Sequence, residues 1–159
     1  MRSTPLLWVL ALSLCAGCSN APAPAPVSPA EHAANDTAAA AATHLGVWYW
    51  IGTTTGTQTL AAADPARYRI DFADAGTILV QADCNRGRSE YQLAAGTLAI
   101  GPIGLTKMGC PEDSQDREFL AQLAIGGSLM LRGSWLILEL SEGRGSMRFA
   151  RDANAVLTP

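Results

Sequence analysis

Short alternating runs of apolar and polar residues, separated by glycine-containing turns, dominate the sequence after residue 44. In residues 67–72, Tyr68, Ile70 and Phe72 would share one face of a strand, with charged residues on the other face. Asp74-Ala75-Gly76 predicts a hairpin turn after this strand. The same pattern predicts strands around Trp48 and Trp50 and at 77–83, 89–93, 97–100, 128–132, 135–140 and 146–150. The fold class is therefore mainly β, as a small β-barrel or a strongly curved antiparallel meander.

One segment departs from the alternating pattern. Residues 111–124 place Phe119, Leu120, Leu123 and Ala124 on a single helical face. Asp113 or Ser114 would provide the N-cap, and acidic residues fill the first turn. We expect one α-helix here, which plugs or covers the barrel.

The first 17 residues read as a signal peptide, with Arg2, an apolar stretch at 6–14 and small residues before Cys18. The apolar stretch is too short to span a bilayer. Cys15-Ala16-Gly17-Cys18 resembles the lipobox of bacterial lipoproteins, which implies that Cys18 is acylated and becomes the N-terminus. Cys15 stands where Leu is usual and only one basic residue precedes the stretch, so soluble secretion is the alternative. By resemblance to the sorting rules of Gram-negative lipoproteins, an aspartate after the acylated cysteine would retain the protein at the inner membrane. Ser19 occupies that position here, which favours the outer membrane, with the domain in the periplasm.

Residues 18–43 form a lipid-bearing N-terminus and an Ala/Pro-rich tether, followed by one domain at 44–152 and a tail at 153–159. His32 and His44 lie in or beside the tether, which argues against a histidine triad or a multi-histidine metal site. The net charge is −3, and no basic face is evident, so we expect no nucleic-acid partner. We expect a monomer without metal or cofactor, held at a membrane through Cys18.

The tryptophans allow two interpretations. Trp48 and Trp50 would lie on the same face of the first strand and could form a binding platform. Large aromatic residues on an alternating strand are more often part of the core, and we predict that role for both, and for Trp135.

Cys84 and Cys110 are the two cysteines of the domain. In an oxidising compartment they are expected to form a disulfide. A reactive Cys84 thiol, with Arg86 and Arg88 nearby to favour the thiolate, is the alternative. A zinc site would lack ligands, since the two thiols have no domain histidine beside them.

These cysteines belong to a longer set of motif residues. Cys84-Asn85, Tyr91, residues 98–103, Thr106-x-Met108-x-Cys110 and Glu118-Phe119-Leu120 resemble the META domain of heat-inducible HslJ-like lipoproteins. Gly87 and Ser89 replace an aromatic residue and a glycine of the family pattern. The resemblance implies a lipocalin-like barrel with one helix, a Cys84–Cys110 link and an envelope location, but no agreed catalytic activity.

If the cysteines are bonded, the segments that carry Arg86, Arg88 and Lys107 must approach each other. Three cations could then bind a phosphate, a lipid headgroup or an acidic partner surface. The competing interpretation, which we prefer, is a solvated turn that Asp83 and Glu90 neutralise.

An acidic cluster suggests an enzyme, through paired carboxylates for glycoside hydrolysis. The cluster comprises Glu112, Asp113, Asp116 and Glu118. Acidic residues in the first turn of a helix explain it better, and no phosphate-binding loop or nucleophile elbow occurs. We therefore expect no catalysis.

The sequence is consistent with two functions. The first is a noncatalytic envelope lipoprotein that supports envelope stress or antibiotic tolerance through contacts with an unknown envelope protein or surface component. The alternative is a binding barrel, for a small apolar ligand or as a lysozyme inhibitor. An interior filled by Tyr68, Phe72, Leu138 and Phe149 would argue against a ligand cavity.

Overall fold

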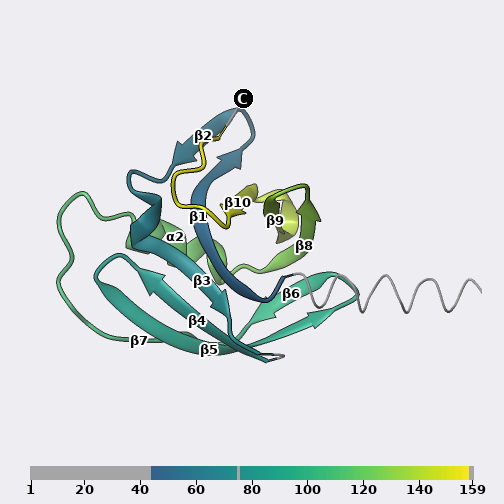
Figure 1. Ribbon diagram of the computed structural model, residues 1–159, viewed down its shortest axis with the longest axis horizontal. Coiled ribbons are helices and arrows are strands. Elements are labelled where there is room, and N and C mark those ends of the chain that lie inside the picture. Colours follow the sequence, from purple (N-terminus) through teal and green to yellow (C-terminus); the bar gives the residue numbers. More distant parts are fainter. Residues whose placement is uncertain (1–43, 75, 158–159) are drawn as a thin grey trace, which may run out of the picture.

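A single antiparallel sheet makes up most of the chain in the computed structural model, which describes residues 44–74 and 76–157 (Figure 1). Among these residues there is one α-helix, α2 (Asp116–Leu123). The strands are β1 (Gly46–Thr55), β2 (Gln58–Ala61), β3 (Tyr68–Phe72), β4 (Thr77–Ala82), β5 (Asn85–Ala94), β6 (Thr97–Ile100), β7 (Gly104–Leu105), β8 (Gly127–Arg132), β9 (Trp135–Leu140) and β10 (Ser146–Ala150). Two 3-10 turns, η1 (Pro65–Arg67) and η2 (Ser141–Gly143), complete the described elements.

The sheet closes on itself because its last strand pairs with its first. The barrel order is β1, β3, β4, β5, β6, β8, β9 and β10, and β10 returns to β1 with Phe149 opposite Trp50. The prediction of a mainly β barrel with one helix is confirmed, and the closed form replaces the open meander. All of these pairings lie within residues 46–150.

β1 changes its partner part-way along its length. Its first half pairs with β3, and after an irregularity between Trp50 and Gly52 it pairs with β2. A bulge of this kind bends a strand and redirects it. As a result, the end of β1 lies between β10 and β2, and β2 projects beyond the other barrel strands (Figure 1).

Side chains fill the interior of the barrel. Trp48 and Trp50 are 2% and 0% exposed, which confirms that they belong to the core. Tyr68, Phe72, Leu138 and Phe149 are also fully or almost fully buried, and they belong to the same apolar cluster. Burying one such side chain contributes roughly 1.5 to 3 kcal/mol. The interior is therefore a packed core, which argues against a ligand cavity there.

Helix α2 packs against the barrel behind β1 and β3 in Figure 1. The ring of Phe119 lies 5.4 Å from that of Trp50 and 5.7 Å from that of Tyr68, between centroids. Leu123, one turn later, is also buried. After the helix, Gly126 has a φ of +65°, and a Cβ there would lie 2.5 Å from the Leu98 carbonyl oxygen. Glycine therefore allows the chain to turn closely past β6.

The helix is shorter than predicted. It starts at Asp116 rather than near Pro111, and its N-cap is Gln115, so the prediction of Asp113 or Ser114 was wrong. The Gln115 backbone N–H donates to the Tyr68 hydroxyl at 2.8 Å, and its side chain bonds to the Ala61 oxygen and the Ala63 nitrogen. Tertiary contacts thus fix where the helix begins.

Other elements also differ from the prediction. Trp135 is half-buried and faces outward, because Leu136 and Leu138 occupy the inner face of β9, so the core prediction for Trp135 was wrong. His44 is only 5% exposed and packs against Phe72, so it belongs to the barrel rather than to the tether. β2 and β7 were not predicted.

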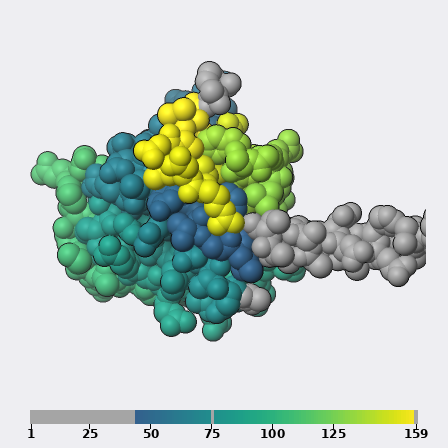
Figure 2. Space-filling model, viewed as in Figure 1, coloured from purple at the N-terminus to yellow at the C-terminus, as the bar shows by residue number. Residues whose placement is uncertain are grey.

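The C-terminal segment lies across the outside of β1 (Figure 2, yellow over blue). The Arg151 guanidinium donates to the carbonyl oxygens of Leu45 and Val47, at 2.6 and 3.0 Å. It also lies 3.8 Å from the ring centroid of Trp48. Leu157 reaches the backbone beside Gly52. Among the described residues, no helix has both the length and the apolar character needed to cross a membrane.

Candidate functional site

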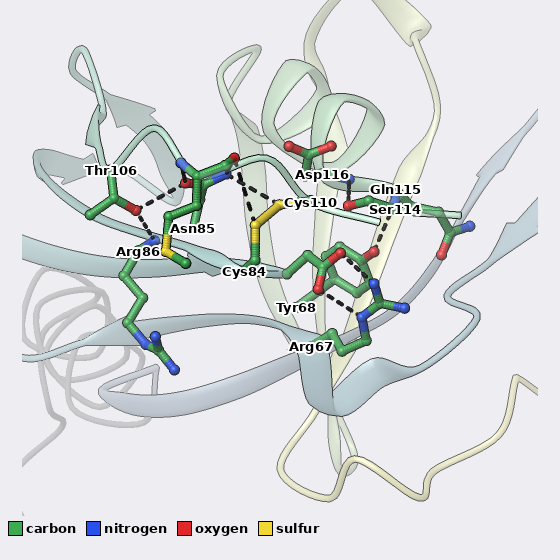
Figure 3. Close-up of a disulfide and its surroundings, with 12 residues drawn as sticks. Arg67, Tyr68, Cys84, Asn85, Arg86, Thr106, Cys110, Ser114, Gln115 and Asp116 are labelled. Atoms are coloured by element: carbon green, nitrogen blue, oxygen red, sulfur yellow. Dashed lines mark hydrogen bonds and ion pairs between the residues drawn. A yellow bond between two sulfur atoms is a disulfide. The ribbon is translucent and has the colours of Figure 1, made fainter. Parts of the chain in front are cut away.

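The motif residues meet at one disulfide, between Cys84 and Cys110 (Figure 3). Cys84 follows β4 and Cys110 follows β7, and their Cα atoms are 5.5 Å apart. The expected pairing is present in the structure. A bonded Cys84 has no thiolate, so the alternative of a reactive Cys84 thiol does not apply to this state.

Asn85, next to Cys84, forms hydrogen bonds to the Thr106-x-Met108-x-Cys110 segment of the motif. Its side-chain oxygen accepts hydrogen bonds from the Met108 N–H at 2.8 Å and the Thr106 hydroxyl at 3.0 Å. Its amide group donates to the Met108 carbonyl at 3.2 Å and to the Cys110 sulfur at 3.3 Å. Asn85 is itself buried, so these bonds replace those that water would make. We call Asn85, Thr106, Met108 and the disulfide the clasp.

Thr106 ties the clasp to β5. Its hydroxyl accepts a hydrogen bond from the Arg86 N–H at 3.0 Å, and its own N–H donates to the Arg86 carbonyl at 2.9 Å. The polar side-chain atoms of Asn85 and Thr106 all have hydrogen-bond partners within the protein. Their arrangement is architectural, because it leaves no polar atom of these two side chains directed at a substrate.

An ion pair lies on the other side of the disulfide (Figure 3). Arg67, from η1, bonds to both carboxylate oxygens of Asp83, including a 2.7 Å bond from its Nε. Asp113 lies 3.4 Å from the same guanidinium. The hydrogen bond from Arg67 lowers the pKa of the Asp83 carboxyl below its ordinary value. This charged group is paired and largely enclosed, which favours a structural role over proton transfer.

The structure brings Arg86, Arg88 and Lys107 to one side of the barrel. Arg86 and Arg88 are exposed on β5, and Lys107 is exposed directly after Thr106. Asp83 does not neutralise them, because it pairs with Arg67. None of the three forms an ion pair within the described part of the chain.

The acidic cluster surrounds the start of α2, with Asp116 and Glu118 in its first turn. Glu112 and Asp113 are exposed in the preceding loop, where Asp113 contacts Arg67. Among the described residues, no three or more His, Cys, Asp and Glu side chains are grouped so as to hold a metal ion.

Sequence reasoning missed the central position of Asn85, the Arg67–Asp83 pair and Arg151. The Cys-Asn and Thr-x-Met-x-Cys spacings signalled the first of these, since Asn and Thr are residues that bond to nearby backbone. No local pattern signals the other two, because their partners lie on distant segments. Cys18, the predicted lipidation residue, lies outside the described residues.

The chain matches the META domain family over residues 43–153, which is more than half of its length and includes every barrel strand. The protein belongs to the META domain family. In this META domain, the residues that carry the family motif build the clasp and the helix packing rather than an open site.

Two solved structures resemble this META domain in fold. One, an NMR structure of a protein from Burkholderia xenovorans, has 21% identity and a TM-score of 0.57, with 86% of this chain and 96% of that chain covered. The other, a crystal structure of a DUF4847 family protein from Bacteroides vulgatus, has 16% identity and a TM-score of 0.50, with 69% and 94% covered. No curated protein matches the chain significantly.

Proposed function

We propose that the protein is a noncatalytic META-domain lipoprotein of the bacterial envelope. It is anchored to the outer membrane through Cys18, with its domain in the periplasm. It supports envelope stress or antibiotic tolerance through contacts of its surface with an envelope protein or surface component. Cys15-Ala16-Gly17-Cys18, followed by an Ala/Pro-rich tether, is the single observation that carries this proposal. Several acyl chains on one residue would provide stable membrane attachment.

The barrel supports a role through contacts. Its interior is packed with side chains such as Trp50, Tyr68 and Phe149, and its motif side chains bond to each other. A function that depends on the outer surface is consistent with both observations. The clasp supports such a role by shaping the loop that leads to α2.

Mass spectrometry of the protein purified from its native envelope tests the anchor. We expect a mature N-terminus at Cys18 that carries acyl groups, and a Cys18→Ala variant that lacks them and leaves the membrane fraction. Cys15→Leu is the matched control, because it removes a cysteine and places the usual residue at that lipobox position. A wild-type protein with an unmodified, soluble N-terminus would refute the anchor.

A deletion strain tests the role in tolerance. We expect lower survival under envelope stress, restored by the wild-type gene and not by Cys18→Ala. Lysozyme inhibition by the isolated domain is measured in parallel. Nanomolar inhibition would replace this proposal with the inhibitor function.

A further inference from the structure

Two neighbouring strands, β4 and β5, present an outer face that differs in charge from the rest of this acidic protein. On β5, the buried side chains of Asn85 and Ser89 alternate with the exposed side chains of Arg86 and Arg88. Residues two apart on a strand lie on the same face, about 7 Å from each other. Both arginines therefore project from the barrel wall in the same direction.

The pairing register adds further residues to this face. Leu79 of β4 lies directly opposite Arg88, and Gln81 lies opposite Arg86. Arg69 of β3 lies opposite Gln81 on its other side. Lys107 follows Thr106, which is hydrogen-bonded to Arg86. We define the cationic face as Arg69, Leu79, Arg86, Arg88, Lys107 and the adjoining Met108.

The charge of this face is not balanced locally. The ion pairs of the described chain involve Arg67 and Arg144, and none of the four cations of the face. Asp71, two residues from Arg69, and Glu90, two residues from Arg88, are the carboxylates on the same strands and side. Four cations stand against two carboxylates on this part of the barrel wall, while the whole sequence carries −3. Glu112, Asp116 and Glu118 line a pocket with Met108, so the positive charge is concentrated around Arg86 and Arg88.

The cationic face also exposes apolar side chains. Leu79 is 42% exposed beside Arg88, and Met108 is 62% exposed beside Lys107. The Met108 backbone is fixed by Asn85, so its side chain is free to face outward on an ordered loop. Cations that surround exposed apolar groups suit an interface where negative headgroups lie over acyl chains.

We infer that the cationic face binds the anionic headgroups of a phospholipid surface. The inference deepens the proposed function and rests on it, because a domain tethered at Cys18 would lie within reach of such a surface. Arg86 and Arg88 project from the outside of the barrel wall, where a flat charged surface can reach both of them. A plane of negative charge needs no groove, and each Arg or Lys near it contributes about fivefold in binding.

Vesicle binding by the isolated domain, residues 43–159 with the disulfide formed, tests the inference, because this segment contains every barrel strand and the His44, Arg151 and Leu157 side chains that pack against them. We expect binding to vesicles of phosphatidylcholine and phosphatidylglycerol in equal parts, and not to phosphatidylcholine alone. Binding should weaken as salt is raised. Arg86→Glu with Arg88→Glu should lower the affinity at least about 25-fold, since two favourable contacts are lost and two repulsions are added.

Arg132→Glu with Arg144→Glu is the matched control, since both residues are exposed and lie on or beside β8 and β10, which do not pair with β4 or β5. It makes the same change in net charge and should lower the affinity only a few-fold. Equal losses in the two double variants, or no binding by the wild type, would overturn the inference. So would binding of soluble polyglutamate, but not of vesicles, that depends on Arg86 and Arg88, because the partner would then be an acidic protein.

Unfolding midpoints of all variants should match the wild type, because every substituted side chain is exposed. The domain carries no lipid in this experiment. Absence of vesicle binding therefore says nothing about acylation at Cys18. An unmodified Cys18 in the envelope likewise says nothing about vesicle binding by the domain. Failure of the inference and failure of the proposed function are thus distinguishable.

Discussion

Asn85 shows how much one side chain can determine in a small barrel. It is buried, and its two polar atoms bond to four partners on residues 106–110. Apart from the bonds of Thr106 to Arg86, the strand pairing next to this loop is that of the two-residue strand β7. The position of the loop therefore depends on Asn85 as well as on the disulfide.

Asn85→Ala should lower the free energy of unfolding by about 2 to 3 kcal/mol, because buried hydrogen bonds are lost and partner groups are left unpaired. Denaturant unfolding of the oxidised protein measures this loss. Asn154→Ala is the control, since Asn154 is exposed and bonds only to Asp152, and it should change stability by less than about 0.5 kcal/mol. A loss no larger than the control would mean that the disulfide alone holds the loop.

At the scale of elements, the alternation of apolar and polar residues predicted those strands that have one buried and one exposed face. β6, β9 and β10 begin and end at the predicted residues, 97–100, 135–140 and 146–150. β2 could not be predicted in this way, because all four of its residues are exposed and no alternation marks it. The helix start was also misplaced, because Gln115 is held by contacts with β2 and β3 that the local sequence does not record.

The link between η1 and the β4–β5 turn should make stability depend on pH. Because Arg67 lowers the pKa of Asp83 in the folded state, the unfolded chain binds a proton more readily at mildly acidic pH. The stability from this pair is present above the unfolded pKa, near 3.9, and is lost as pH falls through the lower folded pKa. The free energy of unfolding should therefore decline as the protein is acidified below about pH 5.

Asp83→Asn is the informative comparison, because Asn tolerates the positive φ of 56° at this position and cannot titrate. Urea unfolding at a series of pH values should give a smaller decline for this variant than for the wild type. Asp152→Asn, at an exposed site, should keep the wild-type decline. Parallel curves for the wild type and Asp83→Asn would show that the ion pair contributes nothing to acid sensitivity.

At the scale of the whole molecule, closure of the barrel and closure of the disulfide loop join different segments of the chain. The pairing of β1 with β10 joins the ends of the domain, whereas the disulfide joins Cys84 to Cys110 near its middle. The sequence predicted a barrel and the two cysteines, but the partners of β1 arise from contacts between distant segments. The face that carries Arg86 and Arg88 likewise became visible only when the strand register was known.

Cys84→Ser with Cys110→Ser should leave the barrel folded and lower its stability by about 3.5 kcal/mol, the chain-entropy value for a loop that spans 26 residues. Far-ultraviolet circular dichroism checks the fold, and denaturant unfolding measures the stability. The wild type in reductant should behave in the same way. Loss of β structure in both would mean that the barrel requires the disulfide to close.

The way in which β1 is held has a mechanical consequence. β1 pairs with β3 over residues 46–49 on one side and with β10 over residues 49–54 on the other, and Arg151 fixes the carbonyl oxygens of Leu45 and Val47 at its start. A pull on the chain ahead of His44 would run along β1, so the hydrogen bonds on both of its sides would be loaded together in shear rather than opened one at a time. The barrel is therefore built to resist tension applied from its N-terminal end.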